Sequence, residues 1–284
     1  MTDTPVPTAA DTPAEDTAAP AKKEKKEDSF FVFLIKLVVA VVLFRSLIFA
    51  PFYIPSESML PRLVNGDYLL LAKWPYGYSR KSLAFGLPLL PEHRILASNP
   101  ERGDVVVFKA PEHDNEDWIK RVIGLPGDTV QMKDGQLWLN NQPIPKVKIA
   151  DFEVKVSPNT HCYSPQFMAK NAENEDVCRY PRFTETLPGG KSYEVLDLIT
   201  NHVKDTTDPV IIPEGHVFLM GDNRDNSEDS RYPADPRGGI GIVPIDNLLG
   251  RATVMMWSTD GGAEWLKPWT WFTAARWGRI GGTF

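Results

Sequence analysis

The chain has 284 residues, of which 42% are hydrophobic and 24% are charged, so it can bury a substantial core and is not a wholly disordered protein. Its 31 Lys and Arg residues against 37 Asp and Glu residues give a net charge of −6, which argues against nucleic acid as a partner. The abundant prolines and glycines separate short β-branched runs in the later part of the chain, which predicts a mainly β body.

Residues 1–28 have the composition of a solvated tail. They are rich in Ala, Pro, Thr and Asp and end in the charged run KKEKKED. Such a segment buries too little apolar surface to offset the entropy lost on ordering. We therefore expect residues 1–28 to be disordered.

An apolar segment follows at residues 29–50 and is long enough to cross a bilayer as one helix. Lys36 and Arg45 interrupt it, but they fall on opposite faces of a helix and so do not form the polar stripe of an interfacial helix. A cleaved signal peptide is the alternative, yet no small-x-small site follows the segment. We expect an uncleaved transmembrane helix embedded in the lipid bilayer.

Basic residues just before this helix predict its orientation. The Lys and Arg count keeps residues 1–28 on the cytoplasmic side, so residues 51–284 should form an exported domain. Cys162 and Cys178 would then lie in an oxidising space, where a disulfide between them is favoured over two free thiols. No Cys/His spacing typical of a metal site is present, and we expect no metal. The basic residues that precede the helix and predict its orientation are Lys22, Lys23, Lys25 and Lys26.

Beyond the helix, short apolar runs between turn residues predict strands. Residues 130–139 should form a hairpin about Asp134 and Gly135, the dipeptide that type I′ turns prefer. The segment from about 145 to 210 has weak periodicity and contains both cysteines, so we expect a small non-catalytic insertion there. The strands are expected at residues 67–73, 104–109, 117–124, 216–221 and 252–257.

One of these strands gives Lys120 an unusual environment. Alternation along the strand places Lys120 on the same face as Trp118 and Val122. Burial of that face would bury the lysine and lower its pKa. An edge strand with Lys120 reaching solvent is the alternative, and it is favoured by this strand taken alone, since lysines are rarely buried.

The stretch GDNRDNSEDSR, residues 221–231, is dense in acidic and amide side chains. An EF-hand counted from Asp222 would place Arg224 where a ligand belongs and Ser227 where glycine belongs, so calcium binding is not predicted. Taken alone, the stretch is a solvated turn with an ion pair between Asp229 and Arg231. Neither an H-E-x-x-H nor a G-x-S-x-G motif occurs in the chain.

Three stretches in order change this interpretation: PSESMLP after the apolar helix, KRVIGLPGD at residues 120–128, and GDNRDNSEDSR. Together they closely resemble bacterial type I signal peptidases, membrane-anchored serine proteases that remove signal peptides from exported proteins. RGDVVVF, residues 102–108, resembles a fourth conserved box of that family, and the resemblance runs to about residue 257. It implies a β-sheet catalytic domain with an inserted subdomain, at the bacterial inner membrane.

The resemblance also implies roles for individual residues. Ser58 matches the nucleophile and Lys120 the general base of a Ser–Lys dyad. Ser56 matches the serine that joins the Ser58 N–H in an oxyanion hole, and Ser227 matches the residue that orients the lysine. The other matched residues are a supporting salt bridge, Asp229 with Arg231, and two that shape the site, Gly221 and Asp222.

The implied substrates are preproteins cleaved after small residues at positions −1 and −3, with no cofactor. Arg62 and Glu57 depart from the family pattern, which has Thr and often Gly at these positions. The resemblance therefore does not determine the shape of this loop. Another Ser–Lys processing peptidase of the same fold, such as one that matures conjugation pili, is an alternative. A membrane-tethered β-domain that only binds exported chains is the alternative outside the enzymes.

The last twenty residues or so, 265–284, combine aromatic and basic side chains. Amphipathic aromatics favour membrane interfaces, and we hypothesise that this segment contacts the bilayer surface. A packed terminal segment is the equally supported alternative.

Overall fold

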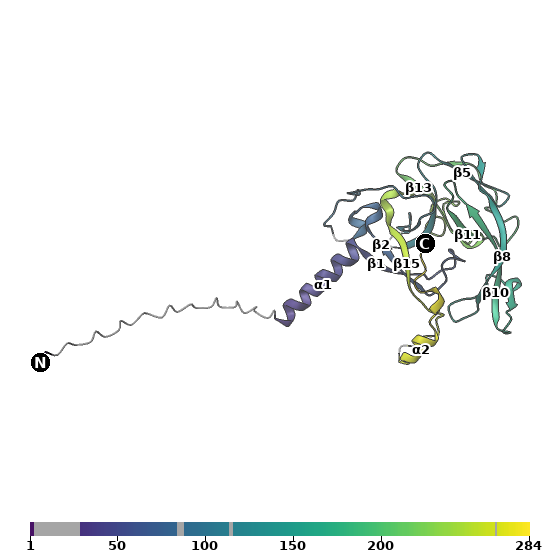
Figure 1. The fold of residues 1–284 in the computed structure, drawn as a ribbon. Coiled ribbons are helices and arrows are strands. Elements are labelled where there is room, and N and C mark those ends of the chain that lie inside the picture. Colours follow the sequence, from purple (N-terminus) through teal and green to yellow (C-terminus); the bar gives the residue numbers. More distant parts are fainter. Residues whose placement is uncertain (3–28, 84–87, 114–115, 265) are drawn as a thin grey trace. The chain divides into compact units, whose positions relative to one another are not determined.

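The computed structural model describes residues 1–2, 29–83, 88–113, 116–264 and 266–284 (Figure 1). Residues 3–28 of the expected tail lie outside this part. Helix α1, Phe30–Leu47, has a mean hydropathy of 2.5, and its length and composition would allow it to cross a membrane. It ends before the expected boundary at residue 50, because Phe49 and Ala50 already belong to strand β1 and pair with β2.

The main sheet of the body contains seven strands in the described part of the chain, in the order β1-β2-β15-β3-β4-β13-β14. Figure 1 shows β1, β2 and β15 side by side. The strands predicted from apolar runs all occur here. Their bounds are β1 Phe49–Tyr53, β2 Asp67–Ala72, β3 Val105–Lys109, β4 Asp117–Gly124, β13 His216–Met220, β14 Val243–Pro244 and β15 Leu248–Ser258.

Both faces of this sheet are covered at its centre. Along β3, Val106 and Phe108 belong to one apolar cluster, whereas Val105 and Val107 belong to another on the opposite face. A strand buried on both faces has a continuous apolar sequence instead of an alternating one, which explains the run VVVF.

A second sheet of four described strands has the order β12-β5-β6-β7. Its β5–β6 hairpin turns at Asp134 and Gly135, which have φ values of 49° and 74°. Positive φ at both central residues is the requirement of a type I′ turn, so the predicted hairpin is confirmed. The strands are β5 Thr129–Lys133, β6 Gln136–Leu139, β7 Gln142–Pro143 and β12 Val210–Ile211.

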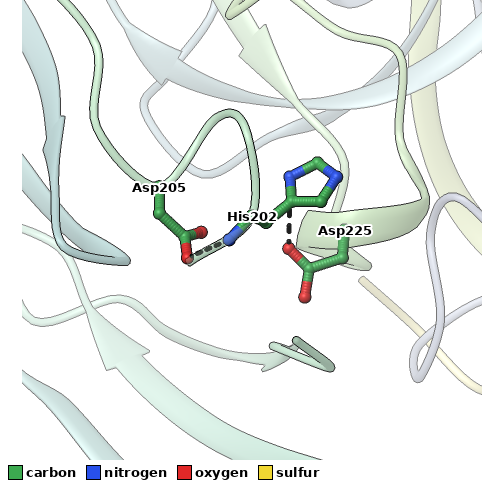
Figure 2. Close-up of side chains that lie close together, drawn as sticks. All are labelled: His202, Asp205 and Asp225. Atoms are coloured by element: carbon green, nitrogen blue, oxygen red, sulfur yellow. Dashed lines mark hydrogen bonds and ion pairs between the residues drawn. The ribbon is translucent and has the colours of Figure 1, made fainter. Parts of the chain in front are cut away.

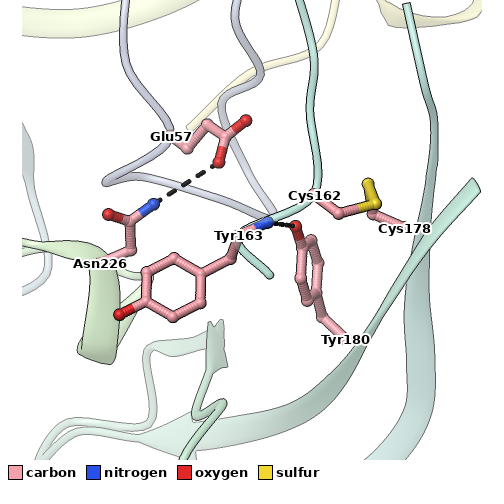
Figure 3. Close-up of a disulfide and its surroundings, with 6 residues drawn as sticks. All are labelled: Glu57, Cys162, Tyr163, Cys178, Tyr180 and Asn226. Carbon is pink, nitrogen blue, oxygen red and sulfur yellow. Dashed lines mark hydrogen bonds between the residues drawn. A yellow bond between two sulfur atoms is a disulfide. The ribbon is translucent and has the colours of Figure 1, made fainter. Parts of the chain in front are cut away.

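The segment expected to be an insertion contains a third sheet. β10 pairs with β8, β9 and β11, and a disulfide between Cys162 and Cys178 joins the loop before β9 to β10 (Figure 3). We use the name inserted subdomain for residues 145–210, the bounds expected from the sequence, although Val210 already belongs to β12 of the second sheet. Its strands are β8 Lys146–Lys155, β9 Met168–Lys170, β10 Asp176–Thr186 and β11 Ser192–Leu196.

The C-terminal segment contains a short helix, α2, Pro268–Thr273. Two of its arginines are bound to the body: Arg276 donates to the carbonyl of Asn65, and Arg279 forms an ion pair with Asp67 at 2.6 Å. Trp269 and Phe272, in contrast, are 64% and 63% exposed. The segment is therefore packed through its arginines while these aromatic rings face outward. Trp265 lies outside the described residues.

Candidate active site

Lys120 and Ser58 meet although 62 residues separate them in the chain. Lys120 Nζ donates a hydrogen bond to Ser58 Oγ at 2.7 Å. Lys120 lies on β4, which pairs with β3 on one side and β13 on the other, and it is only 3% exposed. The interpretation of Lys120 as an edge residue reaching solvent is therefore wrong, because β4 is an interior strand.

Burial sets the protonation of this lysine. Desolvation lowers the pKa of Lys120 to about 8, although the negative charges of Asp229 and Asp222 favour the ammonium form. The Nζ atom also lies 5.4 Å from the ring centre of Trp118, its neighbour on the same strand face. Lys120 is thus closer to neutrality at pH 7 than an exposed lysine.

The turn that carries Ser58 is anchored by apolar neighbours. Met59 and Leu60, which follow it directly, are 1% exposed and pack into two different clusters. Ser58 itself is 8% exposed. The serine hydroxyl is therefore presented by a turn whose next two side chains are fixed in the core.

A cavity of about 610 Å³ contains the two side chains and opens to solvent. Ser56 lines the same cavity, with its Oγ 3.5 Å from Ser58 Oγ. A hydroxyl and a serine–lysine pair thus share one space large enough for several residues of an extended chain. Apolar side chains line part of the wall: Phe52, Pro55, Trp118, Ile119 and Tyr232.

Ser227 lines this cavity but does not make the expected contact. Its hydroxyl is buried and has no hydrogen-bond partner among the described residues. The hydrogen bond expected from Ser227 to Lys120 is therefore absent, and the lysine nitrogen is directed at Ser58 instead.

Gly221 lies where no side chain fits. A Cβ atom at this position would be 2.2 Å from Ser227 Oγ and 2.5 Å from the carbonyl oxygen of Ser58. Its N–H donates to Asp229, whose carboxylate accepts two further hydrogen bonds from the Arg231 side chain, at 2.8 and 2.9 Å. The sequence predicted this salt bridge, and the structure contains it as a fully buried pair.

Two buried ion pairs of the site were missed in the sequence. Arg121 donates two hydrogen bonds to Asp222, at 2.8 and 2.7 Å. Arg224 pairs with Glu185 of β10. Strand alternation could have indicated Arg121, since it lies on the face opposite Lys120, but its partner is 101 residues away. These pairs bind the stretch 221–231 to β4 and to the inserted subdomain.

A cluster of three potential metal ligands lies beside the same stretch (Figure 2). The ligand atoms of His202, Asp205 and Asp225 lie within 4.8 Å of one another. Asp225 accepts hydrogen bonds from the N–H groups of Leu198 and Ile199, and its other oxygen is 3.6 Å from His202 Nδ1. Asp205 accepts the N–H of His202. These contacts join the turn at Asp225 to the inserted subdomain.

Glu57 is not among the residues that line the cavity, and its side chain lies near Asn226 in the surroundings of the disulfide (Figure 3). Asn226 Nδ2 is 3.5 Å from its carboxylate, and burial raises the pKa of Glu57. Beside the disulfide, the Tyr163 N–H donates to the Tyr180 hydroxyl. The departure from the family pattern at residue 57 is thus accommodated between the turn that carries Ser58 and the inserted subdomain.

Comparison with known proteins assigns this arrangement to a family. The family model described as "Signal peptidase, peptidase S26" matches residues 28–257. The chain belongs to the signal peptidase S26 family. It is therefore a serine peptidase with signal peptidase I activity, as its motifs imply, and an enzyme of this type acts on preproteins.

Individual members of the family are similar over most of the chain. A signal peptidase I of Rickettsia typhi is 34% identical over 246 residues, which cover 84% of this chain and 82% of that protein. One of Rickettsia akari is 35% identical over 231 residues, covering 78% and 77%. A crystal structure of a signal peptidase I from Enterococcus faecalis is 25% identical and covers 54% of this chain and 97% of that one, with a TM-score of 0.28.

Proposed function

We propose that this peptidase removes N-terminal signal peptides from exported preproteins, with Ser58 as nucleophile and Lys120 as general base. The observation that carries the proposal is the 2.7 Å contact between Lys120 Nζ and Ser58 Oγ inside an open cavity. A serine hydroxyl is a weak nucleophile until a neighbouring base takes its proton, and this lysine is the basic group in contact with it.

The pKa of about 8 makes the lysine suitable as a base. At pH 7 a lysine with that pKa is neutral in about a tenth of the molecules, on the order of 200 times more than one with the ordinary pKa of about 10.4. Neutral Lys120 would accept the Ser58 proton during attack on the scissile carbonyl and return it to the leaving amine. Water would then hydrolyse the acyl-enzyme with the same lysine as base.

Charge develops on the carbonyl oxygen during this attack. We assign its stabilisation to the backbone N–H of Ser58 and the hydroxyl of Ser56, which lines the cavity beside it. Removing one such donor typically costs about 10²–10³ in rate. Gly221 and the buried Asp229–Arg231 pair would hold the surrounding backbone in place.

Cleavage after small residues at positions −1 and −3 is the specificity that we expect from the family. The apolar wall of the cavity is compatible with small apolar side chains of an extended substrate. The test is a set of preproteins with Ala, Val or Phe at −1, incubated with the purified enzyme in detergent. Products with the mass of cleavage after Ala, and none from Ser58→Ala enzyme, are expected; cleavage by Ser58→Ala would refute the assignment.

For the location of the enzyme, we propose that α1 anchors it in the bacterial inner membrane with the body outside the cytoplasm. The apolar length of α1 and the disulfide in the body support this orientation. Protease added to sealed inverted vesicles should then leave the body intact. Digestion of the body in sealed inverted vesicles would contradict this orientation and place the body on the cytoplasmic side.

The exposed aromatics of the C-terminal segment support contact with the membrane surface. Trp269 and Phe272 face outward, beside Lys267. We expect the double substitution Trp269→Ser with Phe272→Ser to weaken vesicle binding of a body that lacks α1. Unchanged binding would favour the alternative, a segment that only packs on the body.

The alternative of a conjugation-pilus processing peptidase makes a different prediction in the preprotein assay. The assay separates the two candidates by substrate, because only a signal peptidase cleaves a range of unrelated preproteins at their signal junctions.

A further inference from the structure

Asn223 holds the backbone on both sides of Ser58. Its N–H donates to the carbonyl oxygen of Ser58 at 3.0 Å, and its side-chain Nδ2 donates to the carbonyl oxygen of Glu57 at 3.2 Å. The Leu60 N–H donates to the Glu57 carbonyl as well, at 3.1 Å. The peptide unit that joins Glu57 to Ser58 is thus fixed through its oxygen by two donors.

Fixing this oxygen also fixes the opposite end of the same unit. A trans peptide is planar, and its N–H points away from its C=O. The Ser58 N–H has no hydrogen-bond partner in the part of the chain that the structure describes. It is therefore free to bind a group in the cavity. The direction of this N–H is set by the two hydrogen bonds that the Glu57 carbonyl accepts.

We propose that Asn223 is a positioning residue, whose side-chain amide aims the Ser58 N–H at the oxyanion formed from the substrate carbonyl. The inference rests on the proposed function, in which that N–H is an oxyanion-hole donor. Asn223 does not touch the substrate in this scheme. It acts through the peptide unit between Glu57 and Ser58.

The burial of Asn223 supports a role of this kind. The residue is 1% exposed, and its Oδ1 atom has no hydrogen-bond partner among the described residues. A buried acceptor without a partner lowers stability. The amide is therefore poorly suited to a purely structural role, whereas its donor nitrogen is well placed to orient the nucleophile turn.

The backbone that carries Asn223 is rigidly supported. The Leu196 N–H of β11 donates to the carbonyl of Asp222 at 2.9 Å, and Leu196 and Asn223 form a parallel bridge. Asp222 is held in turn by the two hydrogen bonds from Arg121. The inserted subdomain and β4 thus hold the backbone of Asn223, which in turn holds the peptide unit between Glu57 and Ser58.

The test uses the full-length enzyme in detergent with Asn223→Ala and Asn223→Asp, the second of which keeps the side-chain size and removes the donor. A peptide substrate gives kcat and KM, and the corresponding peptide aldehyde, which forms a tetrahedral adduct with a serine nucleophile, reports transition-state binding. Asn171→Ala, on the loop between β9 and β10, is the matched control.

Both Asn223 variants should lose about 10²-fold in kcat, as expected for a misdirected oxyanion donor, with KM changed by less than about threefold. Aldehyde binding should weaken by the same factor as kcat/KM. The fold loss for Asn223→Ala should be equal at every pH, because Lys120 is untouched. The control should match the parent in all of these measurements.

Several results would overturn the inference. They are a folded variant that keeps kcat within threefold of the parent, a change confined to KM, a shifted pH profile for Asn223→Ala, or loss of the fold in both variants. Ser58→Ala in the same assay separates this failure from failure of the proposed function. If the Ser58→Ala variant is as active as the parent, the proposed function itself is wrong.

Discussion

Burial lowers the pKa of Lys120 to about 8, and the carboxylate of Asp229, buried close by, is the strongest of the charges that oppose the shift. The protonation of Lys120, the proposed general base, is therefore set by two opposing effects. Desolvation makes the neutral amine accessible, while Asp229 keeps part of the population protonated.

The first prediction concerns pH. If neutral Lys120 is the base, kcat/KM rises with pH and levels off above about 8, falling about tenfold per pH unit below it. The sign follows because a lowered lysine pKa extends the neutral form to lower pH. The measurement is kcat/KM from pH 5 to 10, with circular dichroism to verify the fold. A level profile down to pH 6 would contradict the assignment.

The second prediction removes the opposing charge. Asp229→Asn should move the acidic limb of the profile to lower pH, because the ammonium of Lys120 loses its main electrostatic support. It should also lower the free energy of unfolding by about 3–5 kcal/mol, since Arg231 is left buried without its partner. Urea denaturation and the pH profile measure the two effects.

The exposed pair of Asp235 and Arg237 provides the control for this variant. Asp235→Asn should change the free energy of unfolding by less than about 1 kcal/mol, because surface ion pairs contribute little. A limb that stays in place or moves to higher pH in Asp229→Asn would argue against the electrostatic coupling.

The third prediction concerns the space at Gly221. Gly221→Ala places a methyl group 2.2 Å from Ser227 Oγ and 2.5 Å from the Ser58 carbonyl oxygen, so the backbone of Ser58, the proposed nucleophile, must shift together with Ser227. A displacement of about 1 Å can cost 10²-fold in rate, and we expect a loss of that order in kcat. Gly278→Ala, with no atom within 4 Å of the added Cβ, should behave as the parent in the same peptidase assay. Equal activity of the two variants would exclude a steric role for Gly221.

The fourth prediction concerns the disulfide. Cys162 and Cys178 are 16 residues apart, and closing a loop of this size stabilises a protein by about 3 kcal/mol in the chain-entropy model. Replacement of both cysteines by alanine should lower the free energy of unfolding by that amount, measured by guanidinium denaturation. The same loss should appear when the parent is reduced before denaturation. An unchanged stability on reduction would mean that the bond is not formed in the protein.

Much of the fold follows from local patterns in the sequence. The apolar run of β3 and the Asp134–Gly135 turn each specify their structure within a few residues. The long strands β8 and β10 were not predicted, since most side chains of β8 are exposed and the buried positions of β10 do not alternate along the strand. Their pairing is stabilised by contacts between segments distant in sequence.

The site was predictable in its residue types but not in its contacts. The burial of Lys120 depends on whether β4 is an interior strand, and that is decided by β3 and β13 together. The absence of a hydrogen bond from Ser227 to Lys120 and the hydrogen bonds from Asn223 to the turn that carries Ser58 likewise depend on three-dimensional packing. No spacing in the sequence indicates them.

The most direct test of the dyad is a double-mutant cycle on preprotein cleavage, with kcat/KM measured for the parent, Ser58→Ala, Lys120→Met and the variant with both changes. Groups that act as one unit lose their effect together, so the double variant should be no slower than the slower of the two single variants. Losses that multiply in the double variant, or parent-like cleavage by either single variant, would contradict a Ser58–Lys120 dyad.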